Sequence, residues 1–163
     1  MDLQDKVAVI TGGASGLGRA TAEMVINNGG KVAIIDLNED LAGQTAKELG
    51  ENAAPFVANV SEDESAVQAV SAIMERFGAI HINVNCAGVG TPGRTLGREG
   101  PLPLNHFNFV IQVNLVGTFN TLRLCANEMQ QNEPVNEDGE RGVIINTASV
   151  AAFDGQIGQA AYS

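Results

Sequence analysis

The stretch VAVITGGASGLG, residues 7–18, restricts the fold of this chain more than any other part of its sequence. Apolar and β-branched residues run into Thr11, glycines follow at Gly12, Gly16 and Gly18, and a helical pattern begins at once. A glycine turn lets the backbone approach a ligand closely, and the helix after it directs unpaired N–H groups at an anion. The stretch therefore predicts a pyrophosphate site, although the glycines alone are equally compatible with an ordinary tight turn.

A second apolar run, residues 31–35, delivers Asp36 at its end, 18 residues after Gly18. The dinucleotide-binding fingerprint has an acid about 20 residues beyond its glycines, where the carboxylate binds the hydroxyls of the adenosine ribose. A carboxylate at that point repels the additional phosphate of NADP. Asp36 therefore predicts NAD as the cofactor.

Apolar runs alternate with helical patterns along the rest of the chain, which implies right-handed βαβ units and a parallel sheet covered on both faces. We expect an α/β, Rossmann-like doubly wound sheet with strand order 3-2-1-4-5. The later strands are predicted at residues 54–60, 80–85 and 142–147, and the later helices at 39–49, 61–77 and 105–130. The ligand crevice of such a sheet lies at the carboxyl ends of the strands, where these residues are expected to converge: Gly12, Asp36, Asn59, Cys86 and Ser149.

Two local patterns complete the predicted secondary structure. Residues 61–64, SEDE, are predicted to be a capping box that opens the third helix. The first helix is predicted to present one face made of Leu17, Ala20, Thr21, Met24 and Val25.

Composition and charge exclude several classes of protein. With 44% hydrophobic and 17% charged residues, the chain suits one α/β domain over residues 1–163. Nineteen acidic and nine basic residues give a formal charge of −10, so we expect no nucleic-acid partner.

Cys86 and Cys125 lie far apart in apolar segments, which favours reduced thiols and offers no metal-ligand spacing. Because the N-terminus is acidic and no segment reads as a bilayer span, we expect a cytoplasmic protein without a membrane partner.

Four motifs together resemble the short-chain dehydrogenase/reductase family over essentially the whole chain. They are TGGASGLG at 11–18, NCAG at 85–88, VNLVGTF at 113–119, and Ser149 followed by Tyr162 thirteen positions later. Within the family, the NCAG variant and the segment from residue 131 to the end resemble the type 2 3-hydroxyacyl-CoA dehydrogenases. These enzymes oxidise 3-hydroxyacyl-CoA with NAD and often accept hydroxysteroids and other secondary alcohols.

The resemblance assigns roles at the reacting centre. It makes Tyr162 the acid or base, Ser149 a hydrogen-bond donor to the same substrate oxygen, and Asn114 the holder of a water in the proton relay. Gln156 is assigned to the substrate, with an ordinary loop residue as an equal alternative. Taken alone, Ser149 reads as a cap or turn residue and Asn114 as a helix-packing residue.

The resemblance also assigns the cofactor contacts. Ser15 and Leu17 would contact the phosphates and the turn, Asp36 the ribose, and Asn59 with Val60 the adenine. The family more often has Asp where this chain has Asn59, whose amide oxygen can still accept a hydrogen bond from adenine. The full set of expected cofactor-binding residues is Gly12, Ser15, Gly16, Leu17, Gly18, Asp36, Asn59, Val60, Cys86, Ala87, Gly88 and Tyr162.

The family has a lysine four residues after the tyrosine, and this sequence ends at Ser163. We therefore expect a C-terminally incomplete chain that lacks the last two strands of the family. The first hypothesis is an NAD-dependent 3-hydroxyacyl-CoA dehydrogenase, with a hydroxysteroid or other secondary-alcohol dehydrogenase as the alternative. A hypothesis of another class is a non-catalytic NAD-binding module. A homo-oligomer, a tetramer at full length, is expected from the family.

Overall fold

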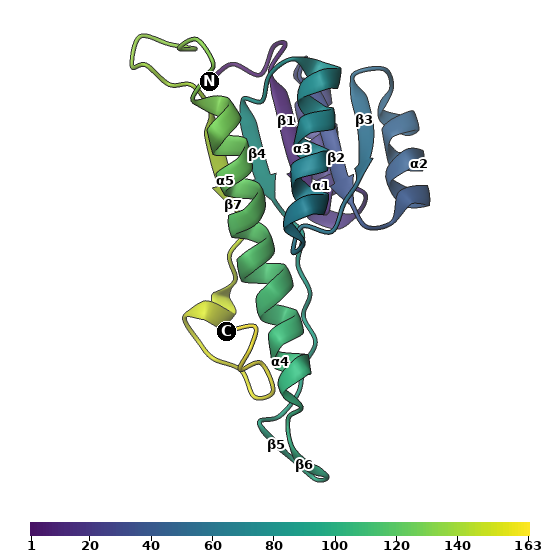
Figure 1. Ribbon diagram of the computed structural model, residues 1–163, viewed down its shortest axis with the longest axis vertical. Coiled ribbons are helices and arrows are strands. Elements are labelled where there is room, and N and C mark those ends of the chain that lie inside the picture. Colours follow the sequence, from purple (N-terminus) through teal and green to yellow (C-terminus); the bar gives the residue numbers. More distant parts are fainter.

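Five parallel strands form the central sheet of the computed structural model, which describes all 163 residues. The sheet order is β3-β2-β1-β4-β7 (Figure 1), which confirms the predicted order 3-2-1-4-5. The strands are β1 (Val7–Thr11), β2 (Lys31–Asp36), β3 (Ala53–Val57), β4 (Ile82–Asn85) and β7 (Val143–Asn146).

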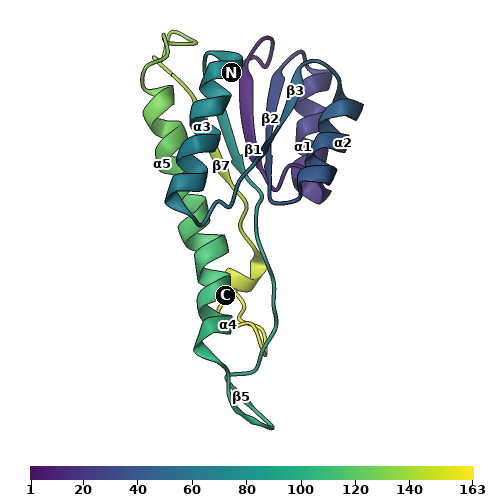
Figure 2. The same cartoon turned by 45° about the vertical axis from the view of Figure 1, so that its right-hand side comes forward.

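Helices cover both faces of this sheet (Figure 2). One face packs against α1 (Gly16–Asn27) and α2 (Glu39–Leu49). The other packs against α3 (Asp63–Phe77) and the end of a long helix made of α4 (Leu104–Ile111), η1 (Gln112–Gly117) and α5 (Thr118–Met129). Smaller elements are the hairpin β5 (Leu96–Gly97) and β6 (Gly100–Pro101) and the 3₁₀ helix η2 (Val150–Ala152).

Successive residues of the inner strands point to opposite faces, so each strand contributes to two hydrophobic clusters. Ile10 and Ile34 are fully buried toward α1 and α2, whereas Val9 and Ile35 are buried toward α3 and α5. Burial on both faces explains why these strands read as continuous apolar runs. β7 forms one edge of the sheet, and its Ile145 side chain is half exposed.

The buried face of α1 differs from the prediction. Gly18, Ala22 and Val25 are buried, whereas Leu17 is 71% and Met24 48% exposed. The small residues face the sheet because the helix lies very close to the glycine turn: a Cβ on Gly18 would lie 2.2 Å from the carbonyl oxygen of Gly12. Close contact with backbone, and not side-chain hydrophobicity, therefore decides which face is buried.

The predicted capping box of α3 is wrong. The N-cap residue is Glu62, which makes no side-chain cap hydrogen bond. The Ser61 hydroxyl instead donates to Oδ1 of Asn59 at 2.7 Å, and the Asn59 amide N–H donates to the Ser65 hydroxyl oxygen at 2.9 Å. An Asn-centred turn thus replaces the box and ends the extended segment before α3.

The long helix runs continuously over Leu104–Met129, but residues 112–117 form a π-helical turn that the sequence pattern did not predict. By length and composition alone, its 26 residues would suffice to cross a membrane, so the expectation that no segment reads as a span is wrong by that measure. Core helices of soluble proteins satisfy the same measure, and α5 packs against α3 and the sheet through Cys125 and Met129.

Candidate functional site

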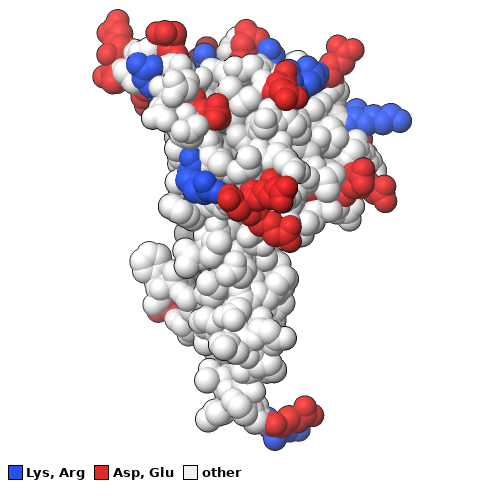
Figure 3. Space-filling view, viewed as in Figure 1, with Lys and Arg blue, Asp and Glu red and all other residues white.

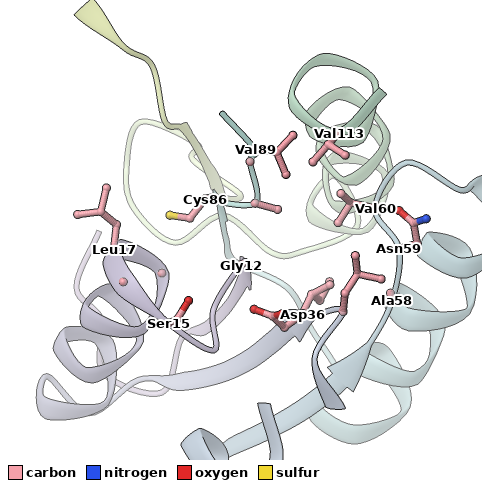
Figure 4. Close-up of a pocket in the computed structure, with 16 residues that line it drawn as sticks. Gly12, Ser15, Leu17, Asp36, Ala58, Asn59, Val60, Cys86, Val89 and Val113 are labelled. Carbon is pink, nitrogen blue, oxygen red and sulfur yellow. The ribbon is translucent and has the colours of Figure 1, made fainter. Parts of the chain in front are cut away.

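The glycine turn between β1 and α1 forms one wall of a cavity of about 400 Å³ at the carboxyl ends of the strands (Figure 4). Gly12 and Gly16 have φ angles of +63° and +52°, a conformation that favours glycine. A Cβ on Gly12 would lie 2.9 Å from the amide nitrogen of Ala87, so the turn and the segment after β4 nearly touch. Ser15 is the N-cap of α1 and its side chain makes no cap hydrogen bond, so the first turn of the helix is open to an anion.

Asp36 at the end of β2 lines the same cavity, with its carboxylate directed toward the glycine turn (Figure 4). One carboxylate oxygen accepts the Ala14 amide N–H at 3.2 Å, and the other accepts the Asn38 amide N–H at 3.1 Å. These two bonds fix the orientation of the side chain and leave lone pairs on both oxygens for ligand hydroxyls.

Asn59 and Val60 line the same cavity (Figure 4), and the Asn59 amide binds neighbouring residues of the chain. Its Oδ1 accepts both the amide and the hydroxyl of Ser61, and its Nδ2 donates to Glu62. With two acceptor sites already used, the side chain has no free lone pair for adenine. The expected contact of Asn59 with adenine therefore stays a prediction, which would require its oxygen to leave Ser61, whereas the Val60 amide N–H has no acceptor within the protein.

The segment from Cys86 to Gly88 closes the cavity and is held by a residue that sequence reasoning missed. The buried Thr11 hydroxyl accepts the amide N–H of Cys86 at 3.2 Å and that of Ala87 at 3.1 Å. A polar residue at the end of an otherwise apolar strand is the sequence signal that could have identified it.

A second cavity, of about 760 Å³, adjoins the first and shares residues 86–89 with it. Its wall includes Asn114 from η1, Ser149 after β7, and Tyr162. The three predicted catalytic residues therefore meet in one cavity beside the predicted cofactor site. On the outside of the molecule, charged side chains gather over the sheet, whereas the region of α4 and the C-terminal segment is nearly uncharged except at the β5–β6 tip (Figure 3).

The Asn114 side chain binds backbone in this structure. Its Oδ1 accepts the Val89 amide N–H at 2.8 Å, and its Nδ2 donates to the Val89 carbonyl at 2.9 Å. Both hydrogen bonds tie the segment after β4 to the π-helical turn. The side chain thus acts first as a clamp, and a water would have to use its remaining acceptor or donor capacity.

Ser149 has the capping role, and its geometry is compatible with the donor role that sequence reasoning treated as the alternative. Its hydroxyl oxygen accepts the Ala151 amide N–H at 3.2 Å, which makes Ser149 the N-cap of η2. The hydroxyl hydrogen remains free to donate. Capping fixes the direction of the side chain, so it is compatible with donation to a ligand in the cavity.

Gln156 does not lie with the other predicted site residues. It is exposed and lines a separate surface groove with Arg94, whereas Gln159 lines the cavity that contains Ser149 and Tyr162. Oε1 of Gln159 is buried without a hydrogen-bond partner, which costs free energy unless a ligand supplies a donor.

Charge around the second cavity is low. Tyr162 is 39% exposed, and no Lys, Arg or His lines this cavity. The structure has no cluster of three or more His, Cys, Asp or Glu side chains that could hold a metal ion. Both cysteines are free: Cys86 borders the two cavities, and burial raises the pKa of Cys125, on the buried face of α5, to about 12.

The residues that line the first cavity fit the adenosine and pyrophosphate parts of a dinucleotide. Gly16 has no atom within 4 Å of the position of a Cβ, so space for a ligand lies directly over the helix N-terminus. Asp36 offers acceptors to ribose hydroxyls and Val60 offers an unpaired donor. The nicotinamide end would then extend past residues 86–89 into the second cavity.

Comparison with known proteins agrees with this geometry. A family model described as short chain dehydrogenase matches residues 6–163. A Bos taurus protein named 3-hydroxyacyl-CoA dehydrogenase type-2 is 49% identical over 159 residues, which cover 96% of this chain and 60% of that protein. A Drosophila melanogaster protein of the same name is 47% identical over 163 residues, covering 99% of this chain and 64% of that protein.

A solved structure gives the same picture. The crystal structure of 3-hydroxyacyl-CoA dehydrogenase type-2 from Mycobacterium avium aligns with a TM-score of 0.90 at 36% identity. The alignment covers 99% of this chain and 64% of that one. The chain thus spans 60 to 64% of the length of these relatives.

Proposed function

This chain belongs to the short chain dehydrogenase family, and on that premise we propose that it acts as an NAD-dependent oxidoreductase that interconverts a secondary alcohol and a ketone. The observation that carries the proposal is the junction of two cavities at residues 86–89, one bordered by Asp36 and the other by Ser149 and Tyr162. The names of the similar proteins favour a 3-hydroxyacyl-CoA as the substrate.

The cofactor would be held by the groups around the first cavity. The N-terminal turn of α1 receives the pyrophosphate, the Asp36 carboxylate accepts hydrogen bonds from the adenosine ribose, and the Val60 amide donates to adenine. The negative charge of Asp36 supports NAD over NADP, because it repels a 2′-phosphate.

In the second cavity, Tyr162 removes the hydroxyl proton of the substrate and Ser149 donates a hydrogen bond to the same oxygen. Bound NAD supplies the hydride acceptor for the carbinol carbon. Asn114 keeps Val89, and with it the wall shared by the two cavities, in position. In the reverse direction Tyr162 returns the proton to the oxygen.

Substrate competition tests the proposed reaction. NADH formation from short-chain 3-hydroxyacyl-CoA is expected to exceed that from a hydroxysteroid or a simple secondary alcohol. Failure of short 3-hydroxyacyl-CoA to react, with turnover of a steroid, would favour the alternative substrate class. A Ser149→Ala variant serves as the control, because it removes the donor and should lower turnover with either substrate.

A non-catalytic NAD-binding module is the second candidate, and one observation favours it. A tyrosine needs a nearby cation to act as a base near neutral pH, and no cationic side chain of this chain lines the second cavity. Separate measurements of NAD binding and NADH formation distinguish the two. Binding without turnover supports the module, whereas turnover abolished by Tyr162→Phe supports the enzyme.

We further propose that the protein forms a homo-oligomer, a tetramer at full length, and is cytoplasmic. Besides Leu104 at its first position, three large apolar side chains of the long helix are at least 49% exposed, a pattern that favours burial against another copy. They are Phe109, Leu115 and Phe119. Sedimentation velocity should show a dimer or a larger species for the wild type, and the Phe119→Glu variant should dissociate it. A monomeric wild type would contradict the proposed oligomer.

The two free cysteines favour a reducing compartment and thereby support the proposed cytoplasmic location. Fractionation of cells tests this location directly.

A further inference from the structure

Val60 lines the first cavity, and its amide N–H has no hydrogen-bond acceptor within the protein. Val60 itself lies in the turn between β3 and α3, outside any regular element, so no strand or helix fixes its peptide groups. The position of the Val60 amide therefore depends on contacts that other parts of the chain make with Val60.

Asn120 of α5 binds the carbonyl group of Val60. Its Nδ2 donates to the Val60 carbonyl at 2.9 Å and to the Glu62 carbonyl at 3.4 Å. Asn120 is only 6% exposed, where α5 packs against the turn before α3. A buried amide in this position costs free energy unless its bonds are made, and here both ends of the amide are bonded.

Arg123 determines which end of the Asn120 amide faces Val60. Its Nε and Nη2 donate to the Asn120 Oδ1 at 3.1 and 2.7 Å, and its guanidinium also pairs with Asp63 at the start of α3. Because a guanidinium has only donors, the amide oxygen must face Arg123 and the NH₂ group must face Val60. The direction of the hydrogen bond to the Val60 carbonyl is therefore fixed.

Gly117 lets the helix approach Val60 closely. A Cβ on Gly117 would lie 2.6 Å from Cγ2 of Val60, so the two can pack at this distance only with a glycine. Gly117 ends the π-helical turn that also carries Asn114, whose amide holds Val89 on the other side of the cavity. One helix thus holds backbone on two walls of the cofactor site, through two buried or half-buried asparagine amides.

We infer that Asn120 is a positioning residue of the adenine subsite: by binding the Val60 carbonyl, it holds the Val60 amide N–H as a donor to the adenine ring. The inference rests on the proposed NAD binding and deepens it, because it assigns one part of the cofactor to one contact of α5. No contact of Asn120 reaches the second cavity, so its effect should be confined to the adenosine half.

The test measures the affinity of the chain for NAD, AMP and nicotinamide mononucleotide by titration calorimetry. Asn120→Asp keeps the acceptor for Arg123 but replaces the donor by an oxygen that repels the Val60 carbonyl. It should weaken NAD and AMP binding about tenfold while leaving binding of nicotinamide mononucleotide unchanged. Gly117→Ala, which displaces Val60 from the other side, should weaken the same two ligands.

Asn127→Asp is the matched control, because it makes the same chemical change at an exposed position of the same helix. Equal losses for all three ligands, or no loss for AMP in a folded variant, would overturn the inference. If Asn120→Asp does not fold, as judged by circular dichroism, Gly117→Ala decides by the same comparison. A wild-type chain that binds neither NAD nor AMP would refute the proposed function itself, and the inference with it.

Discussion

In the proposed NAD site, the Asp36 carboxylate would combine a structural and a selective role in one side chain. It accepts the Ala14 N–H from the glycine turn, and it has the free lone pairs and charge that favour a ribose diol over a 2′-phosphate. For Asp36→Ser we expect the affinity for NAD to fall about tenfold. The ratio of NADP affinity to NAD affinity should rise, because the carboxylate no longer repels the 2′-phosphate. Fluorescence titrations with NADH and NADPH measure both. Asp40→Ser, the same change on the surface of α2, should leave the ratio unchanged, and an unchanged ratio in Asp36→Ser refutes the assignment.

The two cysteines should differ sharply in reactivity, since the thiolate is the reactive form. Burial and the nearby Glu128 raise the pKa of Cys125 to about 12, whereas Cys86 is half buried at the border of the two cavities. Alkylation at pH 8 followed by mass spectrometry should modify Cys86 alone, and NAD should slow the reaction. Cys86→Ser should then remain unmodified. Modification of both residues in the folded protein, or no protection by NAD, would contradict this picture.

At the level of elements, Asn114 connects the π-helical turn to the segment after β4. Asn114→Leu keeps the approximate volume but removes both hydrogen bonds to Val89. The Val89 amide should exchange with solvent about tenfold faster, because its acceptor is lost. Hydrogen exchange measured by NMR tests this, with Asn108→Leu on the exposed side of α4 as the control. Equal exchange rates in wild type and variant would mean that other contacts hold the segment.

His81 connects the amino ends of the parallel strands β1 and β4, at the edge of the sheet opposite the two cavities. Its neutral Nδ1 accepts the Val7 amide N–H at 3.2 Å, and burial, followed by the charge of Lys6, lowers the pKa of His81 below 6.5. A lowered pKa in the folded state means that the unfolded chain binds the proton more tightly. The contribution of neutral His81 to the free energy of unfolding is therefore complete above pH 6.5, and it is lost as the pH falls through the folded-state pKa.

His81→Asn should therefore flatten the fall in the free energy of unfolding between pH 7 and about 5. Urea unfolding at several pH values measures the difference from wild type. The parallel variant His106→Asn, which lies on α4 and makes no such bond to a strand, should keep the wild-type slope. If the slope is the same in all three proteins, His81 does not contribute to it.

The sequence predicted those parts of the site that follow from apolar periodicity. Asp36 is the last residue of β2 and Ser149 follows β7, and a doubly wound topology brings such strand ends together. It did not predict the buried face of α1, because contact between Gly18 and backbone outweighs the exposure of Leu17. A π-helical turn has no side-chain periodicity of its own, and the hydrogen bonds of Asn59 depend on which neighbour competes for its oxygen. These features arise from contacts between distant segments.

For the molecule as a whole, the proposed cofactor site draws on β1, β2, β4 and the turn after β3, so ligand binding and global folding should be coupled. A ligand that binds only the folded state at one hundred times its dissociation constant stabilises it by about 2.7 kcal/mol. For a chain of this size that corresponds to a rise in Tm of roughly 5 to 11 °C. We expect this rise with NAD in thermal unfolding followed by circular dichroism.

The same experiment identifies where the stabilising ligand binds. At an equal NAD concentration, Asp36→Ser should show a smaller rise in Tm, because weaker binding lowers the ratio of ligand to dissociation constant. AMP should reproduce part of the rise, since it occupies the part of the cavity between Asp36 and Val60. An equal rise in wild type and Asp36→Ser would mean that NAD stabilises the protein from another site. The strand ends that line the first cavity meet only when the sheet is assembled. A rise in Tm with NAD that occurs only in the wild type would therefore show that NAD binding at Asp36 stabilises the assembled sheet.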